Sequence, residues 1–182
     1  MFLSGRCAAA SCRKSADSSL YTLNGSNAQK FRITRVKDTA DVSGTCKILS
    51  SLSEKKAADI RYGGLDDGTN LQLWRDNGSR AQAFVFMRNA DGTYQILNRN
   101  SRKALDVKGG GKEAGTEVWQ YTCNGTDAQK WILIQEDGYT VLRAKCSGNV
   151  LDLACADLSD GTDIRSWPWN KSGAQKWKIT AN

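Results

Sequence analysis

The chain has 182 residues, with 17 glycines, one proline, six cysteines and no histidine, and its formal net charge is +7. This length suffices for one domain with a sizeable core, but no apolar run approaches the roughly 18 residues of a membrane-spanning helix. Without histidine, histidine-based catalytic triads and histidine metal ligands are excluded, and no C-x-x-C spacing occurs. We therefore expect no metal and no cofactor. Lysines and arginines are interleaved with acidic residues, so the positive charge does not indicate nucleic-acid binding.

Residues 1–36 match only the second half of the repeats that follow. The segment 20–31 contains an Asn-Gly turn and an Ala-Gln-Lys-Phe tetrapeptide, but no aspartate stands where later copies have one. We interpret residues 1–36 as a partial repeat, the remnant of a preceding domain in a longer protein. The polar residues 37–45 are interpreted as a connector.

Three complete units follow, at about residues 46–89, 90–136 and 137–182. Each contains four short apolar pieces, which in the second unit are residues 94–97, 104–107, 117–121 and 130–134. Strand-length pieces at this spacing, separated by turn residues, favour an all-β barrel or sandwich.

Every unit ends in a glutamine, one spacer residue and a large aromatic residue. These glutamine–aromatic pairs predict a structural core, because the aromatic ring can bury a large apolar area and the amide can connect turns of its own unit. The residues concerned are Gln82, Phe84, Gln129, Trp131, Gln175 and Trp177.

Further positions are fixed relative to each glutamine. An aspartate lies 23 residues before it, a glycine 14 residues before it, an aromatic residue 8 before it and an asparagine 5 before it. The asparagines begin Asn-x-Ser/Thr sequences, which are also glycosylation acceptors. Because most of them are Asn-Gly pairs, we interpret them as turns between strands.

The aspartate and the intervening aromatic residue have a chemistry of their own. A carboxylate accepts hydrogen bonds from vicinal hydroxyl groups, and an aromatic face packs on the C–H face of a sugar ring. The pair suits a neutral sugar. From this chemistry alone, an aspartate that caps a turn and an aromatic residue that shields the core are equally good interpretations.

The triplicated motif, with its upstream aspartate and intervening aromatic residue, resembles the ricin B-type lectins and the related carbohydrate-binding modules of bacterial glycoside hydrolases. The resemblance covers residues 46–182 in three copies and 20–36 in half a copy. It implies a β-trefoil with three pseudo-symmetric repeats at residues 37–182, preceded by an incomplete extra repeat. It further implies one potential sugar pocket per unit, built from Asp59, Gln72 and Trp74, from Asp106, Trp119 and Tyr121, and from Asp152, Arg165 and Trp167.

The chain also departs from that family. Many sugar-binding members have asparagine directly before the glutamine, whereas this chain has alanine in every copy. The residue two before the pocket aromatic is often glutamine; only Gln72 keeps it, so the units are not expected to be equivalent. The family's within-unit disulfides lack their cysteine partners here. The even number of cysteines permits disulfides, and local spacing suggests Cys146–Cys155 and Cys7–Cys12 pairs among the fifteen full connectivities that six cysteines allow.

The resemblance implies a non-catalytic lectin domain or carbohydrate-binding module with up to three shallow pockets. It would direct an attached secreted enzyme or adhesin to a galactose- or xylose-type glycan or polysaccharide, as a monomeric, extracellular module without a membrane span. The alternative is a structural or protein-interaction trefoil whose sugar sites have lapsed, which the repeated alanine favours. A catalytic role has only the adjacent Asp66 and Asp67 to support it, and these fit a solvated turn.

Overall fold

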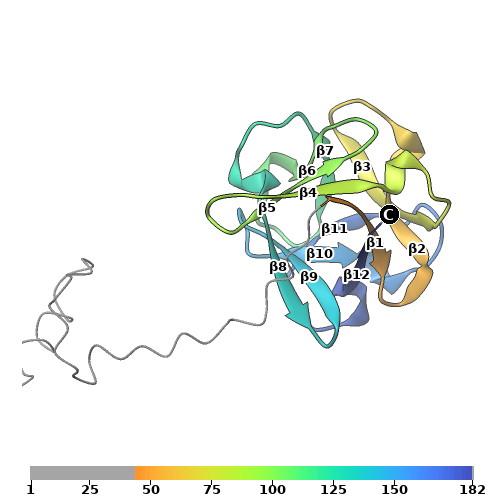
Figure 1. Ribbon diagram of the computed structural model, residues 1–182. Coiled ribbons are helices and arrows are strands. Elements are labelled where there is room, and N and C mark those ends of the chain that lie inside the picture. The colour runs from red at the N-terminus through yellow and green to blue at the C-terminus, as the bar shows by residue number, and fades with distance from the viewer. Residues whose placement is uncertain (1–43, 182) are drawn as a thin grey trace, which may run out of the picture. The chain divides into compact units, whose positions relative to one another are not determined.

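The computed structural model describes residues 44–181, shown in colour in Figure 1. The expected partial repeat at residues 1–36 and the suggested Cys7–Cys12 pair lie outside this range. The described residues form twelve strands in three successive groups of four. The strands are β1 (Gly44–Ser50), β2 (Ser53–Ile60), β3 (Thr69–Arg75), β4 (Phe84–Arg88), β5 (Tyr94–Asn98), β6 (Ala104–Val107), β7 (Thr116–Tyr121), β8 (Trp131–Glu136), β9 (Tyr139–Ala144), β10 (Val150–Leu153), β11 (Ile164–Trp167) and β12 (Trp177–Ala181).

The first and fourth strands of each unit close a barrel. Antiparallel pairs run from β1 to β4, β5, β8, β9 and β12 in turn, and β12 returns to β1. The second and third strands form hairpins (β2–β3, β6–β7 and β10–β11), which meet through β3–β7 and β7–β11 pairing and a bridge between Gln72 and Asp163. A barrel closed by three hairpins is a β-trefoil, so the fold expected from the sequence is confirmed.

One boundary expected from the sequence is wrong. The sequence predicts a connector at residues 37–45, but β1 already begins at Gly44, because the backbone of Gly44 and Thr45 pairs with Phe86 and Val85 of β4. Strand pairing thus includes Gly44, a residue type that is depleted in strands, together with Thr45, whose β-branched side chain suits them.

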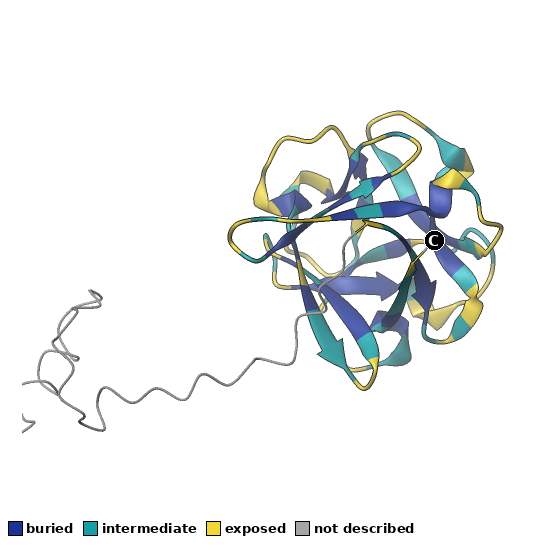
Figure 2. Cartoon of the chain, viewed as in Figure 1, coloured by how far each residue is buried: buried dark blue, intermediate teal, exposed yellow. Residues whose placement is uncertain are grey.

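Burial alternates along the barrel strands, with Trp131 and Leu133 of β8 inside and Ile132 between them exposed. Figure 2 shows buried residues along the strands and exposed residues in the loops. Phe84, Trp131 and Trp177 are fully buried at the start of the last strand of their units. Both tryptophans also donate a hydrogen bond from Nε1 to a backbone carbonyl 3.1 Å away, of Leu105 and Leu151 respectively.

The glycines 14 residues before each glutamine connect the three hairpins. They have φ values of +81°, +89° and +94°, which residues other than glycine rarely adopt. A Cβ atom at Gly115 would lie 3.5 Å from the Trp167 ring. Each glycine N–H donates to a carbonyl of another unit's hairpin, at 2.8–2.9 Å: Gly68 to Gln120, Gly115 to Ser166 and Gly161 to Leu73.

Aspartates next to these glycines support the same junctions. Asp67 accepts from the backbone N–H of Thr122 at 2.7 Å, and Asp160 accepts from that of Arg75 at 2.7 Å. At the third junction the corresponding residue is Pro168, which has no N–H to donate, and the position of the aspartate is taken by Ala114. The two departures from the repeat therefore compensate each other.

We predict that Trp177→Phe lowers the free energy of unfolding by about 2 kcal/mol, because the buried Leu151 carbonyl loses its donor and part of the ring volume is vacated. Urea denaturation measures the change. Lys178→Ala is the control, since it removes only the exposed ion pair with Glu54, and it should leave the midpoint nearly unchanged. Equal effects of the two substitutions would contradict the role given to the indole N–H.

Candidate functional site

Each unit places its repeated aspartate on the first strand of a hairpin, facing the second strand. The strand registers pair Asp59 with Gln72, Asp106 with Trp119 and Asp152 with Arg165. In every unit the opposite residue donates a hydrogen bond to Oδ1 of the aspartate. The donors are Gln72 Nε2 at 3.0 Å, Trp119 Nε1 at 2.8 Å and Arg165 Nε at 3.1 Å. Three chemically different residues thus orient the carboxylate in the same way.

The buried glutamine of each unit fixes the loop that follows the site aromatic. Its Oε1 accepts from the backbone N–H of the asparagine five residues earlier, at 2.8–3.0 Å, and its Nε2 donates to the carbonyl seven residues earlier, at 2.9 Å. The asparagine side chain in turn accepts a backbone N–H two residues ahead, as Asn124 does from Thr126 at 3.0 Å. These asparagines therefore form turns, as the sequence indicated.

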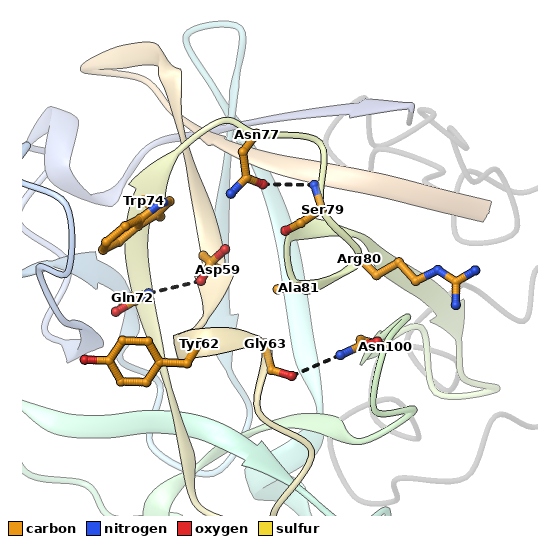
Figure 3. A pocket seen from close by; sticks show the side chains of 10 residues that line it. All are labelled: Asp59, Tyr62, Gly63, Gln72, Trp74, Asn77, Ser79, Arg80, Ala81 and Asn100. Atoms are coloured by element: carbon orange, nitrogen blue, oxygen red, sulfur yellow. Dashed lines mark hydrogen bonds between the residues drawn. The ribbon is translucent and has the colours of Figure 1, made fainter.

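The first unit contains a cavity of about 390 Å³. Asp59 lies at its centre beside Gln72, with Trp74 and Tyr62 on one side and Asn100 on the other (Figure 3). Asp59 is only 5% exposed, whereas Tyr62 is 93% exposed. The cavity thus combines a recessed carboxylate with accessible aromatic rings.

The sequence does not predict several residues that line this cavity, among them Tyr62 and Asn100. Tyr62 lies in the 3-10 turn η2 (Arg61–Gly63) after β2, with φ +57°, but glycine and cysteine occupy its position in the other units. Asn100 comes from the next unit and donates to the Gly63 carbonyl at 3.0 Å. Counting within one unit cannot reveal a contribution from its neighbour. The alanine before the glutamine, Ala81, also lines the cavity.

The second unit contains a larger cavity of about 580 Å³, lined by Asp106, Lys108, Trp119 and Tyr121 among others. The Trp119 and Tyr121 rings stack with centroids 5.9 Å apart and planes 25° apart. Lys108 Nζ lies 5.2 Å from the centre of the Trp119 ring, within the range of a cation–π contact. This site therefore presents a continuous aromatic surface beside the carboxylate.

The third unit uses the same positions differently. The Arg165 guanidinium lies 4.1 Å from the centre of the Trp167 ring and also binds Asp152. The other carboxylate oxygen of Asp152 accepts from Gln175 Nε2 at 2.9 Å. Both the carboxylate and the aromatic face are thus in contact with residues of the chain itself. The unit is not equivalent to the other two, as the loss of glutamine at this position suggested.

Burial raises the pKa of Asp59 above its usual range, and this effect exceeds the opposing one of the hydrogen bond from Gln72. In contrast, the Lys56 ammonium and Arg75 lower the pKa of Asp160, which lies at the junction of the first and third units. Burial also raises the pKa of the Cys146 thiol, which lines the second cavity and is therefore protonated at neutral pH.

The suggested Cys146–Cys155 disulfide is wrong, because both cysteines are free. Cys146 lines the cavity of the second unit, whereas Cys155 is exposed in the 3-10 turn η6 (Ala154–Ala156) after β10 of the third unit. Although they are near each other in sequence, the two cysteines belong to different parts of the fold. Within residues 44–181 no group of three or more His, Cys, Asp and Glu side chains could hold a metal ion, and no helix there is long and apolar enough to cross a membrane.

Comparison with known proteins agrees with this architecture. Residues 80–167 match the family model described as ricin-type β-trefoil lectin domain-like. A designed three-fold symmetric protein, ThreeFoil, is 32% identical with a TM-score of 0.74, and the match covers 76% of this chain and 99% of that protein. No curated protein sequence gives a significant match.

Two natural proteins extend the comparison. An exo-β-1,3-galactanase from Clostridium thermocellum is 31% identical with a TM-score of 0.73, and the match covers 78% of this chain and 31% of that one. The Rhizoctonia solani agglutinin is 18% identical with a TM-score of 0.72, and the match covers 79% and 99% of the two chains, which shows the shared fold.

The closed barrel, the three hairpins and the repeated aspartate–aromatic positions define a lectin-type β-trefoil. The chain belongs to the ricin-type β-trefoil lectin domain-like family. Domains of this type are generally non-catalytic, and the adjacent Asp66 and Asp67 do not form a catalytic pair here. Asp67 instead binds Lys103 Nζ at 2.6 Å and Thr122, which makes it a residue of the junction between units.

We predict that the Asp59 carboxyl titrates at a higher pH than the Asp160 carboxyl, because burial disfavours the charged form of the first and a cation favours that of the second. Side-chain ¹³C chemical shifts followed against pH measure both, and Asp59→Asn and Asp160→Asn identify the signals.

The two groups also affect stability with opposite signs. The stability that Asp160 contributes is present above its unfolded pKa and is lost as the pH falls through its lower folded value. For Asp59, folding becomes less favourable as the pH rises from its unfolded pKa to its higher folded value. Identical midpoints for the two carboxyl groups would contradict the environments described.

Proposed function

We propose that this domain is a carbohydrate-binding module that binds glycan residues in the cavities of its first and second units. The observation that carries the proposal is the arrangement found in both cavities: a recessed aspartate, held by a hydrogen bond from the opposite strand, beside an accessible aromatic ring. The aspartate would accept hydrogen bonds from vicinal hydroxyl groups, and Trp74 or Tyr121 would pack on the C–H face of the sugar.

The third unit has a different role in this proposal. Arg165 covers Trp167 and binds Asp152, so a sugar would have to displace a charged side chain from a carboxylate. That displacement would leave a 4% exposed carboxylate without its cation. We therefore assign two binding sites to the domain, and the third unit fits the alternative of a purely structural repeat.

The sites are shallow, and each is expected to bind weakly. Millimolar affinity corresponds to about 4 kcal/mol. Two sites on one rigid domain can bind a polymeric or multivalent glycan together, which raises the apparent affinity by effective concentration. We further propose that the ligand is a glycan of the galactose or xylose type. In this proposal the domain is extracellular and is attached to a secreted enzyme or adhesin. The likeness to the Clostridium thermocellum galactanase, of which the matched region is 31%, supports attachment to an enzyme.

Changing both site aspartates to asparagine (Asp59→Asn with Asp106→Asn) should weaken glycan binding at least tenfold, because a charge-assisted acceptor becomes a neutral amide. A glycan array identifies a ligand, and calorimetry then measures its affinity. Asp66→Asn is the matched control, since Asp66 is exposed in a turn outside both cavities. Unchanged affinity in the double variant, with the protein still folded, would refute the assignment of these sites.

Trp167→Ala should leave both affinity and stoichiometry unchanged, whereas Trp74→Ala and Tyr121→Ala should each remove one site. The reason is that Arg165 already covers the Trp167 ring. Titration of a small monovalent sugar counts the sites directly, and circular dichroism checks that each variant is folded. A fall in stoichiometry on changing Trp167 would show that the third unit binds sugar after all.

A further inference from the structure

Three arginines gather beside the first unit's cavity. Arg80 lies in the 3-10 turn η3 (Arg80–Gln82), while Arg99 and Arg102 lie in the loop between β5 and β6. Together with Asn98 and the partly buried Val85 and Leu97, they line a separate cavity of about 430 Å³. We call this group of three arginines the arginine pocket.

No acidic side chain of the described residues neutralises the arginine pocket. All three residues are exposed, and within residues 44–181 none of their guanidinium groups forms an ion pair or hydrogen bond with another residue. By contrast, Arg61, Arg75 and Arg165 form ion pairs with Asp163, Asp160 and Asp152. Three cations without counterions in one concavity attract an anion, and the planar guanidinium group suits sulfate and carboxylate oxygens.

The backbone that carries the pocket is fixed by Asn98, which is fully buried. Asn98 Nδ2 donates to the Ala81 carbonyl at 2.9 Å, next to Arg80, and its Oδ1 accepts from the Asn100 N–H at 3.0 Å. The Asn98 carbonyl accepts from the N–H of Arg102 at 2.8 Å, where the chain adopts φ +62°. The buried Asn98 amide thus connects the two segments that carry the arginines. The backbone positions of the three arginines are therefore fixed before a ligand binds.

The pseudo-threefold repeat provides an internal comparison. Between the second and third units, Asp127, Lys145 and Gly148 take the places of Arg80, Arg99 and Arg102, and Lys145 is paired with Asp91 and Asp127. Between the third and first units, Gly173 and Ser51 replace Arg80 and Arg99. The fold therefore does not need cations at these three positions. The three arginines between the first and second units thus have no structural role that the other units require.

Arg80 connects the pocket to the proposed sugar site, since it lines both cavities. In Figure 3 the Arg80 side chain extends away from Trp74, on the same side of the site as Asn100. The cavity beside Asp59 and the arginine pocket therefore adjoin each other at Arg80.

We propose that Arg80, Arg99 and Arg102 bind the anionic substituent of an acidic glycan, a sulfate ester or a uronic acid carboxylate, whose neighbouring sugar lies in the first unit's cavity. The proposal rests on the proposed function, because the sugar site supplies the rest of the recognition. It specifies the substrate class: acidic glycans bind more tightly than their neutral counterparts, and this preference belongs to the first unit alone.

The test compares saccharides with one backbone in neutral, sulfated and uronate-containing forms, first on an array and then by calorimetry. We expect at least one acidic form to bind about tenfold more tightly than the neutral form at low salt, and we expect the difference to shrink as salt screens the exposed charges. The comparison of the sulfated with the uronate form identifies which anion the pocket takes.

Single substitutions distinguish binding by the arginine pocket from a general effect of the positive charge of the domain. Arg99→Gln and Arg102→Gln should each reduce the preference for the acidic form severalfold and together abolish it, while the affinity for the neutral form stays the same. Arg88→Gln is the matched control, because Arg88 is exposed on β4 but does not line the cavity. It removes the same charge and should have no effect.

The possible outcomes are distinguishable. If the neutral saccharide binds and Trp74→Ala removes that binding, but acidic forms bind no more tightly or Arg88→Gln acts like Arg99→Gln, the arginine pocket is refuted and the proposed function stands. If no saccharide binds to the folded protein, both proposals fail. Arginine-dependent binding of single-stranded DNA in place of acidic glycans would overturn the assignment of the ligand class.

Discussion

A buried glutamine amide at the end of each unit holds the loop on which the site aromatic depends. The amides of Gln82, Gln129 and Gln175 are at most 1% exposed, and each satisfies one N–H and one carbonyl group of the preceding loop. Leaving such an amide unpaired would cost about 1–3 kcal/mol, so the loop geometry and the core geometry are fixed together. In the third unit the same amide also reaches Asp152. Core and candidate site are therefore not separate layers of this fold.

The junctions between units are also held by hydrogen bonds at repeated positions. Backbone hydrogen bonds from three glycines connect the hairpins in a cycle, and aspartates add a second contact where the partner has an N–H to offer. The charged groups of the described residues are mostly used in these contacts or in exposed ion pairs. Arg80, Arg99 and Arg102 differ from these paired groups because three unpaired cations line one cavity.

The sequence contained enough information to predict the fold and the positions of the aspartate and aromatic residues, because both repeat in a fixed register. It also indicated that the units differ, from the change of Gln72 to Trp119 and Arg165. It could not show what Arg165 does, since its contacts with Asp152 and Trp167 depend on strand register and rotamer. Tyr62, Asn100 and the arginine pocket were missed for a simpler reason. They do not repeat, and some come from a neighbouring unit, so a search for repeated residues passes over them.

The closure of the barrel has a consequence for synthesis of the chain. β1 pairs with β12, which is synthesised after the other eleven strands of the domain, with Cys46 opposite Ala181. Until β12 emerges, β1 and β9 each lack a neighbour, and unpaired strand edges are sites of association with other chains. The nascent domain therefore keeps one edge of its barrel unoccupied until β12 has been made, so the pairing of β12 removes the last strand edges at which chains could associate.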